Sequence, residues 1–372
     1  MAITLVHATP TVAVTDIFRA WDRGEAVLVV NPGAPEMERQ RLLEAMVPNV
    51  DPAPEVAAVV ATSGTSGQPR GVELTWAGLI SMALATSSAL ATSPSDVWLG
   101  SLPPHHVGGL AVVARSWVTG TRLVALDRFD PSAIQKLMGP GCSGQQPTLT
   151  SLVPTMVGRL LEAGVELGGF RRILVGGAPW VGALPPQAIG TYGLSECWGG
   201  MIYDGEALPG TEVRLGPDDE VFLRGPTLMR GYRLDPIATA AAIDPEGWLH
   251  TGDVGTFDRD GRLRIVDRLR DLIITGGVNV SPTEVERVLA RHPAVADVGV
   301  AAALDAEWGQ RVVAHVVARD PGAPPSLADL RAFAAEFLSS PKLPRQLELT
   351  DALPRTASGK LLRRHLKVRC ET

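Results

Sequence analysis

The stretch ATSGTSGQPRGVEL, residues 61–74, concentrates serine, threonine and glycine directly after a short apolar run. That run, VAAVV at residues 56–60, has the length and the β-branched content of a buried strand. Glycine lets the backbone approach a ligand closely, and successive N–H groups in a glycine-rich turn can surround an anion. The segment 75–90 predicts a helix after the loop, whose N-terminal dipole would also favour negative charge. The stretch therefore predicts a loop that binds a polyphosphate.

A flexible linker of the same composition is the alternative interpretation of this stretch. Its place between a predicted strand and a predicted helix, and not between domains, favours the binding loop. No Gly-Lys-[Ser/Thr] follows at the spacing of a Walker P-loop, which disfavours a P-loop NTPase. The residues that we expect at the phosphates are Thr62, Ser63, Gly64, Thr65, Ser66, Gly67 and Arg70.

The composition of the whole chain indicates a globular protein of two domains. Its 372 residues exceed one typical hydrophobic core, and 45% hydrophobic with 20% charged residues is typical of soluble proteins. A net charge of -6 argues against a nucleic-acid partner. The three cysteines lie far apart, which fits a reducing compartment and gives no zinc spacing. Without a membrane-length apolar run or a signal-peptide pattern, we expect a cytoplasmic protein with no membrane span.

The order of apolar patterns along the chain predicts an α/β fold with a smaller second domain. From residue 56 to about residue 194, short apolar runs alternate with helical patterns, which is typical of layers with parallel strands. From residue 211, short strand-like runs are separated by Gly, Pro and Asp, and DRDG at 258–261 predicts an antiparallel hairpin. We therefore expect a large N-terminal α/β domain, residues 1–267, with layered sheets and an antiparallel segment. A small, mobile α+β C-terminal domain should follow at residues 268–372.

The sequence SPTEVERVLARH, residues 281–292, predicts the first helix of the small domain. Ser281 is the expected N-cap, Pro282 takes the first helical position, and Glu284 would complete a capping box. The apolar face of this helix consists of Val285, Val288 and Leu289. The runs at 295–304 and 310–318 predict strands, and the segment 326–338 predicts a second helix.

The loop TSGTSGQPRGV, residues 62–72, resembles the phosphate-binding signature of the adenylate-forming superfamily, which includes acyl-CoA synthetases, peptide adenylation domains and firefly luciferase. Further stretches similar to the motifs of this family follow in the family's order. They are VGGAP (175–179), TYGLSE (191–196), GWLHTGD (247–253), VDRLRDLIITGGVNVSPTEVE (266–286) and LPRTASGKLLRR (353–364). Because ordered motifs over about three hundred residues are hard to obtain by chance, the resemblance is specific.

The resemblance implies a two-step reaction. A carboxylic acid and ATP give an acyl-adenylate and pyrophosphate, and coenzyme A (CoA) then displaces AMP to form a thioester. Because an anionic carboxylate must approach an anionic phosphate, the site must neutralise charge and hold both reactants in line. The resemblance implies that Glu196 and Thr65 are catalytic residues that bind Mg²⁺, and that Lys360 is the catalytic amine between carboxylate and α-phosphate. Without the motif, Lys360 would be interpreted as a solvated lysine in a basic tail.

The remaining motifs imply the contacts of the nucleotide. Asp253 and Arg268 resemble a pair that binds the ribose, although an aspartate in a turn is often a local cap. Tyr192 would stack on the adenine, and small residues would leave room on its other side. The further residues implied at the nucleotide are Gly176, Gly177, Ala178, Thr191, Gly193 and Ser195.

Arg270 lies where the family has its hinge residue, about which the small domain is expected to rotate between the half-reactions. That rotation would bring Lys360 in for adenylation and withdraw it for thioester formation. Gly276 and Gly277 resemble the stretch that lines the CoA tunnel. Arg270 departs from the usual Asp or Lys, and Arg70 replaces the usual lysine by a wider, planar cation. The segment before the loop is shorter than in relatives, so we expect a reduced N-terminal subdomain.

The segment LPPHHVGGLAVVARSW, residues 102–117, indicates which acid is used. With the compact chain, it resembles the o-succinylbenzoate–CoA ligases of menaquinone biosynthesis, whose dicarboxylate needs a cation for the carboxylate that does not react. His106, Gly109 and Arg115 are expected at this acid, with a packed loop histidine and a surface arginine as the structural alternatives.

The resemblance leaves three other functions open. They are a CoA ligase for another aromatic or medium-chain acid, an adenylation module that loads a carrier protein, and an inactive binding paralogue. The expected partners are a small-molecule carboxylic acid, ATP and CoA, with homodimer formation left open.

Overall fold

The computed structural model describes residues 3–46, 49–63, 69–139, 146–178, 184–355 and 361–366. The chain divides into two compact units, Met1–Arg214 with Phe222–Thr251, and Leu215–Val221 with Gly252–Thr372. The domain boundary expected between residues 267 and 268 stays a prediction. Within the described residues, no helix has the length and apolar character that crossing a membrane requires.

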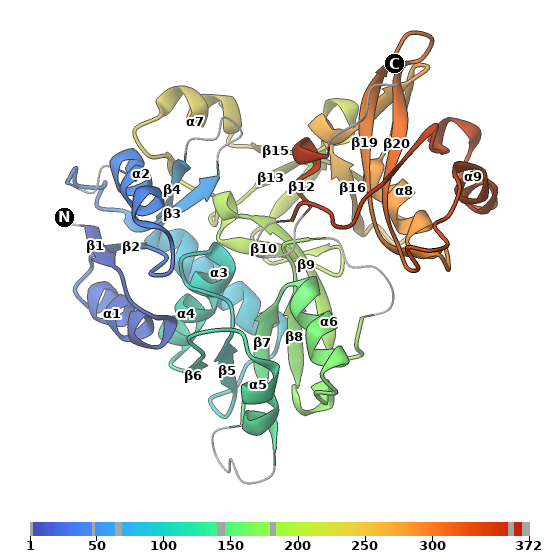
Figure 1. Ribbon diagram of the computed structural model, residues 1–372. Helices are drawn as coiled ribbons and strands as arrows, with labels where there is room; N and C mark the ends of the chain where they lie inside the picture. The colour runs from blue at the N-terminus through green and yellow to red at the C-terminus, as the bar shows by residue number, and fades with distance from the viewer. Residues whose placement is uncertain are drawn as a thin grey trace. The chain divides into compact units, whose positions relative to one another are not determined.

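The first unit contains two sheets with helices beside them (Figure 1). The smaller sheet has the order β1-β2-β3-β4-β14, in which β1, β2 and β3 are parallel and β4 is antiparallel to both of its neighbours. Its strands are β1 (Ile3–Val6), β2 (Ala26–Val29), β3 (Val56–Ser63), β4 (Pro69–Thr75) and β14 (Gly231–Tyr232). The helices between and after these strands are α1 (Pro10–Asp22), α2 (Glu36–Met46) and α7 (Pro236–Ala242).

The larger sheet has the order β11-β10-β9-β8-β7-β5-β6. Strands β9, β8, β7, β5 and β6 are parallel, as the alternating pattern predicts, while β10 and β11 add an antiparallel edge. The strands are β5 (Val97–Gly100), β6 (Arg122–Ala125), β7 (Leu149–Leu152), β8 (Arg172–Val175), β9 (Ala188–Leu194), β10 (Gly199–Tyr203) and β11 (Glu206–Ala207). The helices are α3 (Trp76–Ala89), α4 (Val107–Thr119), α5 (Pro131–Met138) and α6 (Pro154–Glu162). Parallel pairing brings the carboxyl ends of β7, β8 and β9 to one edge, where ligands of α/β sheets usually bind.

The helix predicted at residues 75–90 is confirmed as α3, but the segment that joins the phosphate loop to it is the strand β4, so the helix does not begin at the loop. β4 pairs with β3, where Pro69 lies opposite Ser63, and with β14 on its other side. These two partners satisfy its backbone groups as part of a sheet, which the local sequence could not show. Helix α3 begins only at Trp76, with the Thr75 hydroxyl accepting from the Gly78 N–H at 3.0 Å. The dipole of α3 therefore starts one strand away from the loop.

The segment predicted to be antiparallel forms a sheet of order β12-β13-β15-β16. Its strands are β12 (Glu212–Leu215), β13 (Glu220–Arg224), β15 (Leu249–Phe257) and β16 (Leu263–Arg268). β15 and β16 are antiparallel, which confirms the predicted hairpin. In its turn, the Gly261 N–H donates to the Asp258 carbonyl at 3.0 Å, and Gly261 has a φ of 76° that favours glycine.

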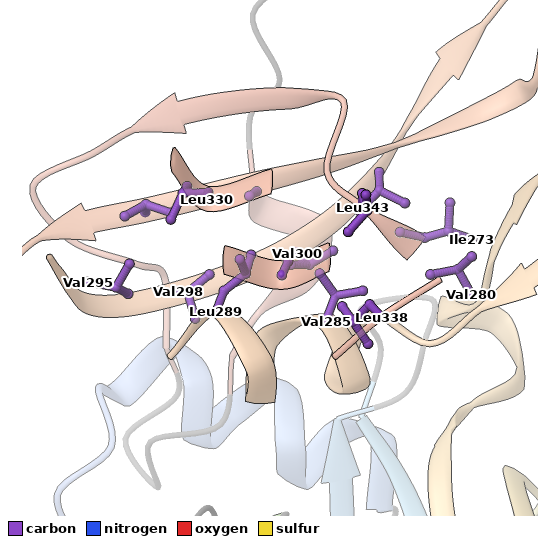
Figure 2. Packing of buried hydrophobic residues seen from close by; sticks show 14 residues of the cluster. Ile273, Val280, Val285, Leu289, Val295, Val298, Val300, Leu330, Leu338 and Leu343 are labelled. Atoms are coloured by element: carbon purple, nitrogen blue, oxygen red, sulfur yellow. The ribbon is translucent and has the colours of Figure 1, made fainter. Parts of the chain in front are cut away.

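The second unit contains a sheet of order β18-β17-β20-β19 with β21 beside β20. Its elements are β17 (Ile273–Thr275), β18 (Val278–Val280), α8 (Pro282–Leu289), β19 (Val295–Asp305), β20 (Gly309–Ala318), α9 (Leu327–Ala335) and β21 (Gln346–Leu349). Figure 2 shows side chains from the helices and from the sheet meeting in one apolar cluster. Val285 and Leu289 are buried in this cluster and Val288 packs against it, which confirms the predicted apolar face of α8.

Ser281 caps helix α8 as predicted, but Glu284 does not complete a capping box. The Ser281 hydroxyl accepts from the Glu284 N–H at 3.1 Å. The Glu284 carboxylate instead accepts two hydrogen bonds from Lys342 Nζ, each of 2.7 Å. Asp267 provides the further carboxylate acceptor at the start of the helix. Its Oδ2 accepts from the Ser281 hydroxyl at 2.7 Å and from the Thr283 N–H at 2.8 Å.

Candidate active site

The carboxyl ends of β8 and β9 carry residues predicted at the adenine. Gly176 follows β8 and lies so close to β9 that a Cβ on it would come within 2.3 Å of Thr191 Oγ1. That hydroxyl donates to the Val175 carbonyl at 3.3 Å. A Cβ on Gly193 would lie 1.7 Å from the Gly199 carbonyl oxygen. Contacts between neighbouring strands therefore require both glycines, whether or not a nucleotide also needs them.

The other predicted adenine residues lie on the same two segments. Gly177 has a φ of 83°, in the left-handed region, and Ala178 follows it. Tyr192 is half-buried in β9, and Ser195 begins the 3-10 turn Ser195–Cys197 after that strand. The structure thus brings both motifs to one edge of a parallel sheet, while their contact with an adenine stays a prediction.

Glu196 is attached at two points to the segment that contains β14. Its carbonyl accepts from the Met229 N–H at 2.7 Å, and its carboxylate Oε1 accepts from the Tyr232 hydroxyl at 2.9 Å. Burial and the Glu196 carboxylate raise the pKa of Tyr232, so the hydroxyl stays protonated and donates. Tyr232 could not be predicted from the sequence, because it lies 36 residues from Glu196 and no spacing pattern links the two.

The described part of the phosphate loop is the hairpin of β3 and β4 that flanks it. Thr62 and Arg70 are opposite each other, and the Thr62 hydroxyl donates to the Arg70 carbonyl at 3.4 Å. The Arg70 guanidinium lies 5.5 Å from the centre of the Tyr232 ring, and its Nε lies 4.0 Å from the Asp235 carboxylate. Ser63 ends β3. The loop residues outside the described part of the chain are Gly64, Thr65, Ser66 and Gly67, whose roles stay predictions.

Two of the residues predicted at the acid lie at the start of α4. The exposed His106 precedes the helix, and its ring centre lies 4.4 Å from that of His105. Burial, together with the neighbouring His106, lowers the pKa of His105 to about 4, so this side chain is neutral near pH 7. A Cβ on Gly109 would lie 2.2 Å from the Pro103 carbonyl oxygen, so glycine lets the preceding loop lie directly against the helix.

Arg115 is a buried cation in α4, so the alternative of a surface arginine is wrong. Arg115 is only 3% exposed, and this burial lowers the pKa of its guanidinium. Its Nη1 donates to Ser151 Oγ at 3.4 Å, and its guanidinium lies 5.5 Å from the centre of the Trp98 ring. Its Nε has no hydrogen-bond partner, and no carboxylate of the described residues pairs with it. A buried charge without a counter-ion is costly, so this arginine is suited to receive an anionic group.

Asp253 and Arg268 form an ion pair in the second unit. They lie opposite each other on β15 and β16, with Arg268 Nε 2.7 Å from Asp253 Oδ1. Asp253 is buried, and the adjacent Gly252 N–H donates to Glu220 Oε1 at 2.8 Å. The pair is a preformed donor and acceptor of the kind that binds a diol, while its contact with ribose stays a prediction.

The predicted hinge and CoA residues follow this pair along the chain. Arg270 has an exposed side chain, 3.7 Å from the Asp271 carboxylate. Gly276 and Gly277 form the turn between β17 and β18, with φ values of 56° and 78°. A Cβ on Gly276 would lie 2.7 Å from the Trp308 ring. The turn therefore explains both glycines without a ligand, and the hinge and the CoA contact stay predictions.

Lys360 lies outside the described residues, but the chain on both of its sides is anchored to the second unit. Arg355 forms an ion pair of 2.7 Å with Asp297 of β19 and is paired with Leu361 by an isolated antiparallel bridge. Arg363 forms an ion pair with Glu286 of α8. The catalytic role of Lys360 stays a prediction.

The predicted magnesium site has a carboxylate of the kind that this metal binds. In the part of the chain that the structure describes, no group of three or more His, Cys, Asp or Glu side chains could hold a metal ion. Mg²⁺ commonly binds through one or two carboxylates together with phosphate oxygens of a nucleotide, so a full protein cage is not needed. Glu196 fits this mode, because the Tyr232 hydroxyl bonds only one of its two carboxylate oxygens, Oε1. Magnesium is therefore expected to bind together with ATP.

Comparison with known proteins identifies the family. The model of the AMP-binding enzyme family matches residues 3–233, and that of the AMP-binding enzyme C-terminal domain matches residues 284–360. A probable 2-succinylbenzoate–CoA ligase of Mycobacterium tuberculosis (strain ATCC 25618 / H37Rv) is 37% identical over 326 residues, which cover 82% of this chain and 82% of the relative. A 2-succinylbenzoate–CoA ligase of Bacillus licheniformis is 35% identical over 342 residues, which cover 84% of this chain and 70% of the relative.

Two solved structures have a similar fold. An o-succinylbenzoate CoA synthetase from Bacillus subtilis, in complex with the acyl-adenylate intermediate OSB-AMP, has a TM-score of 0.84 and 28% identity, with 99% of this chain and 88% of that chain covered. An amide bond synthetase from Marinactinospora thermotolerans has a TM-score of 0.84 and 26% identity, with 98% and 88% covered. These likenesses confirm the predicted fold class, a large α/β part followed by a smaller α+β part. The chain belongs to the AMP-binding enzyme family.

Proposed function

We propose that the chain is an AMP-forming acid–CoA ligase that converts 2-succinylbenzoate into 2-succinylbenzoyl-CoA, a step of menaquinone biosynthesis. The observation that carries the choice of acid is Arg115, a buried arginine without a carboxylate partner among the described residues. 2-Succinylbenzoate has two carboxylates, and the one that does not react needs a cation. The names of the relatives from M. tuberculosis and B. licheniformis support the same acid.

In the first half-reaction, a carboxylate oxygen of the acid attacks the α-phosphorus of ATP. The new O–P bond forms as the bond to the pyrophosphate oxygen breaks, and pyrophosphate leaves with the electron pair. Lys360 places an ammonium between the two anions, and Arg70 with the loop N–H groups holds the triphosphate. Glu196 holds magnesium, which neutralises charge on the phosphate oxygens when it is bound.

In the second half-reaction, the thiol sulfur of CoA attacks the acyl carbonyl carbon. A C–S bond forms, the C–O bond to the phosphate breaks, AMP leaves with its electron pair, and the thiol proton is released to water. Asp253 and Arg268 hold the ribose, and Arg115 holds the free carboxylate through both steps. Rotation about Arg270 withdraws Lys360 between the steps, so one nucleotide site serves both reactions.

The test is thioester formation by the purified chain with ATP, Mg²⁺ and CoA. We expect 2-succinylbenzoyl-CoA, AMP and pyrophosphate in equal amounts by mass spectrometry. The kcat/KM for 2-succinylbenzoate should exceed that for benzoate and for a medium-chain fatty acid by about 100-fold, because only the dicarboxylate pairs with Arg115. Preference for either other acid would identify a different CoA ligase. Adenylate formation without CoA turnover would identify a module that loads a carrier protein.

We also propose that the enzyme is cytoplasmic and forms a homodimer. The support for a dimer is an apolar face on α3, where Ile80 is 44% and Leu84 is 55% exposed. The buried free Cys197 is compatible with a reducing compartment. Light scattering after size-exclusion chromatography should give twice the mass of the chain, and Leu84→Glu should halve it. A wild-type chain that elutes as a monomer at micromolar concentration contradicts the dimer.

A further inference from the structure

Tyr232 lies between two residues of the proposed nucleotide site. Its hydroxyl donates to Glu196 Oε1 at 2.9 Å, and its ring centre lies 5.5 Å from the Arg70 guanidinium. Glu196 is the proposed magnesium ligand, and Arg70 belongs to the phosphate-loop motif, residues 62–72. One side chain therefore contacts both groups, although the three residues come from separate parts of the sequence.

The position of Tyr232 is fixed by a sheet and by a capped helix. Tyr232 lies opposite Val72 in the pairing of β14 with β4. Its N–H donates to the Thr239 hydroxyl of α7 at 2.8 Å. The first turn of α7 is capped by Asp235, whose Oδ1 accepts from the Ala238 N–H at 2.9 Å. A side chain that the fold already holds can orient a partner with little further loss of conformational entropy.

We infer that Tyr232 is a positioning residue for the metal-bound nucleotide, whose hydroxyl orients the Glu196 carboxylate and whose ring supports Arg70. The inference rests on the proposed function. The Met229 N–H already fixes the backbone of Glu196 at 2.7 Å, so the side-chain torsions of Glu196 are the freedom that the hydroxyl removes. A hydrogen bond to one carboxylate oxygen leaves the other oxygen for the metal, as outer-shell donors at metal sites commonly do.

The same contact explains how an arginine serves at position 70. A guanidinium is planar and stacks on aromatic rings, whereas the ammonium of lysine is a compact point charge. The Asp235 carboxylate, 4.0 Å from Arg70 Nε, provides a second contact. The ring and the carboxylate together hold the Arg70 guanidinium in one orientation at the end of the hairpin.

The first test is Tyr232→Phe in the whole chain, which removes the hydroxyl and keeps the ring. The affinity of the protein–ATP complex for Mn²⁺, measured by electron paramagnetic resonance, should fall about 10-fold, because loss of an outer-shell hydrogen bond lowers metal affinity about 10- to 100-fold. The half-saturating Mg²⁺ concentration in ATP–pyrophosphate exchange should rise by the same factor. Metal-free ATP binding, measured by calorimetry, should stay unchanged, because the ring still supports Arg70.

Tyr203→Phe is the matched control for this variant. The Tyr203 hydroxyl forms a hydrogen bond of 3.1 Å with Thr86 and contacts neither Glu196 nor Arg70 in the described structure. Its loss should leave the Mn²⁺ affinity unchanged. A fall in Mn²⁺ affinity in both variants would overturn the inference, since a general loosening of the unit would then explain it.

The second test addresses the ring. Tyr232→Leu and Arg70→Lys should each weaken metal-free ATP binding about 2- to 5-fold, because the first removes the ring and the second removes the planar guanidinium that stacks on it. The two changes combined should cost no more than either change alone. Additive losses would show that Arg70 acts independently of the ring and would overturn this half of the inference.

The third test is a double-mutant cycle with Glu196→Gln. Tyr232→Phe should cause no further loss of Mn²⁺ affinity when Glu196 is replaced, because the hydroxyl acts through that carboxylate. A Mn²⁺ affinity of Tyr232→Phe within twofold of wild type, or no Mn²⁺ binding by the wild-type ATP complex, overturns the inference. A wild-type chain that binds Mn²⁺ and ATP as expected but forms no thioester refutes only the proposed function. Equal melting temperatures of the variants exclude unfolding as the cause.

Discussion

Replacing the buried Arg115 by methionine should stabilise the folded chain while it removes activity toward the dicarboxylate. Arg115 is 3% exposed, and among the described residues its guanidinium has one long hydrogen bond of 3.4 Å to Ser151 and lies 5.5 Å from the centre of the Trp98 ring. Replacement of a buried ion pair by apolar side chains of similar volume is often neutral or stabilises a protein by about 1–4 kcal/mol, and Arg115 has no carboxylate partner among the described residues to leave unpaired. The lost cation–π contact offsets about 2 kcal/mol of this. We therefore expect the free energy of unfolding to rise by up to about 2 kcal/mol.

Two assays on the same variant test the two halves of this prediction. Urea titration of the chain without ligands measures the free energy of unfolding. Steady-state kinetics should show kcat/KM for 2-succinylbenzoate reduced by at least about 100-fold, because removal of one partner of a buried charge pair costs about 3–5 kcal/mol. The kcat/KM for benzoate should change less than about threefold, since benzoate has no second carboxylate to lose a partner. Arg115→Lys keeps the charge without the planar fork and should give an intermediate loss.

One pattern of results would refute the reasoning. If Arg115→Met lowered the free energy of unfolding and left the ratio of kcat/KM for the two acids unchanged, Arg115 would be a structural residue of α4. The unreactive carboxylate would then need another cation.

Three further predictions concern the amine, the ribose pair and the sheet. Lys360→Ala should slow adenylate formation by at least about 100-fold, measured by pyrophosphate exchange, and leave thiolysis of supplied acyl-adenylate nearly unchanged; equal losses would contradict the rotation. Asp253→Ala should raise the KM for ATP about 10-fold without changing the KM for the acid, and an unchanged KM for ATP would remove the ribose assignment. Burial opposes the ionised form of Asp96, but hydrogen bonds from Arg171 and Thr148 hold the pKa of this carboxyl at about 2. The pKa of Asp96 is thus lower in the folded chain than in the unfolded chain, so the ionised carboxylate stabilises the fold at pH 7 by about 2 kcal/mol. This stabilisation is lost as the pH falls from about 4 to 2. In urea titrations, Asp96→Asn should therefore be less stable than wild type at pH 7 and approach wild-type stability at pH 3. Glu212→Gln, which removes an exposed ion pair with Arg224, should change the free energy of unfolding less. An equal loss of stability in Asp96→Asn at both pH values would contradict this.

The sequence could predict those elements in which periodicity and turn chemistry agree. The apolar run at 56–60 is β3, and Ser281 with Pro282 starts α8. β4 could not be predicted, because its short alternation around Val72 and Leu74 merges with the helical pattern that follows. Pairing with β3 and with β14, which is far away in the chain, makes this segment a strand. Such tertiary pairing leaves no mark in a local window.

Most residues of the candidate site were predicted from motif resemblance. Contacts between residues far apart in the sequence could not be predicted in this way. The Tyr232 contact with Glu196 and the Ser151 contact with Arg115 each join side chains 36 residues apart. The sequence also cannot separate a glycine that a ligand needs from one that the backbone needs. Gly276 illustrates this, because its left-handed turn and its packing on Trp308 already exclude a side chain.

In the hairpin of β15 and β16, the ion pair of Asp253 and Arg268 lies at the end opposite the turn. Asp253 and Arg268 face each other at one end, and the exposed turn near Asp258 lies five residues away, roughly 17 Å at about 3.4 Å per residue. The ladder of backbone hydrogen bonds, and not the tip, sets the spacing of carboxylate and guanidinium. The tip can consequently be lengthened, or spliced to a fluorophore or an affinity peptide, and it would report on the end that carries Asp253 and Arg268 from a distance without disturbing it.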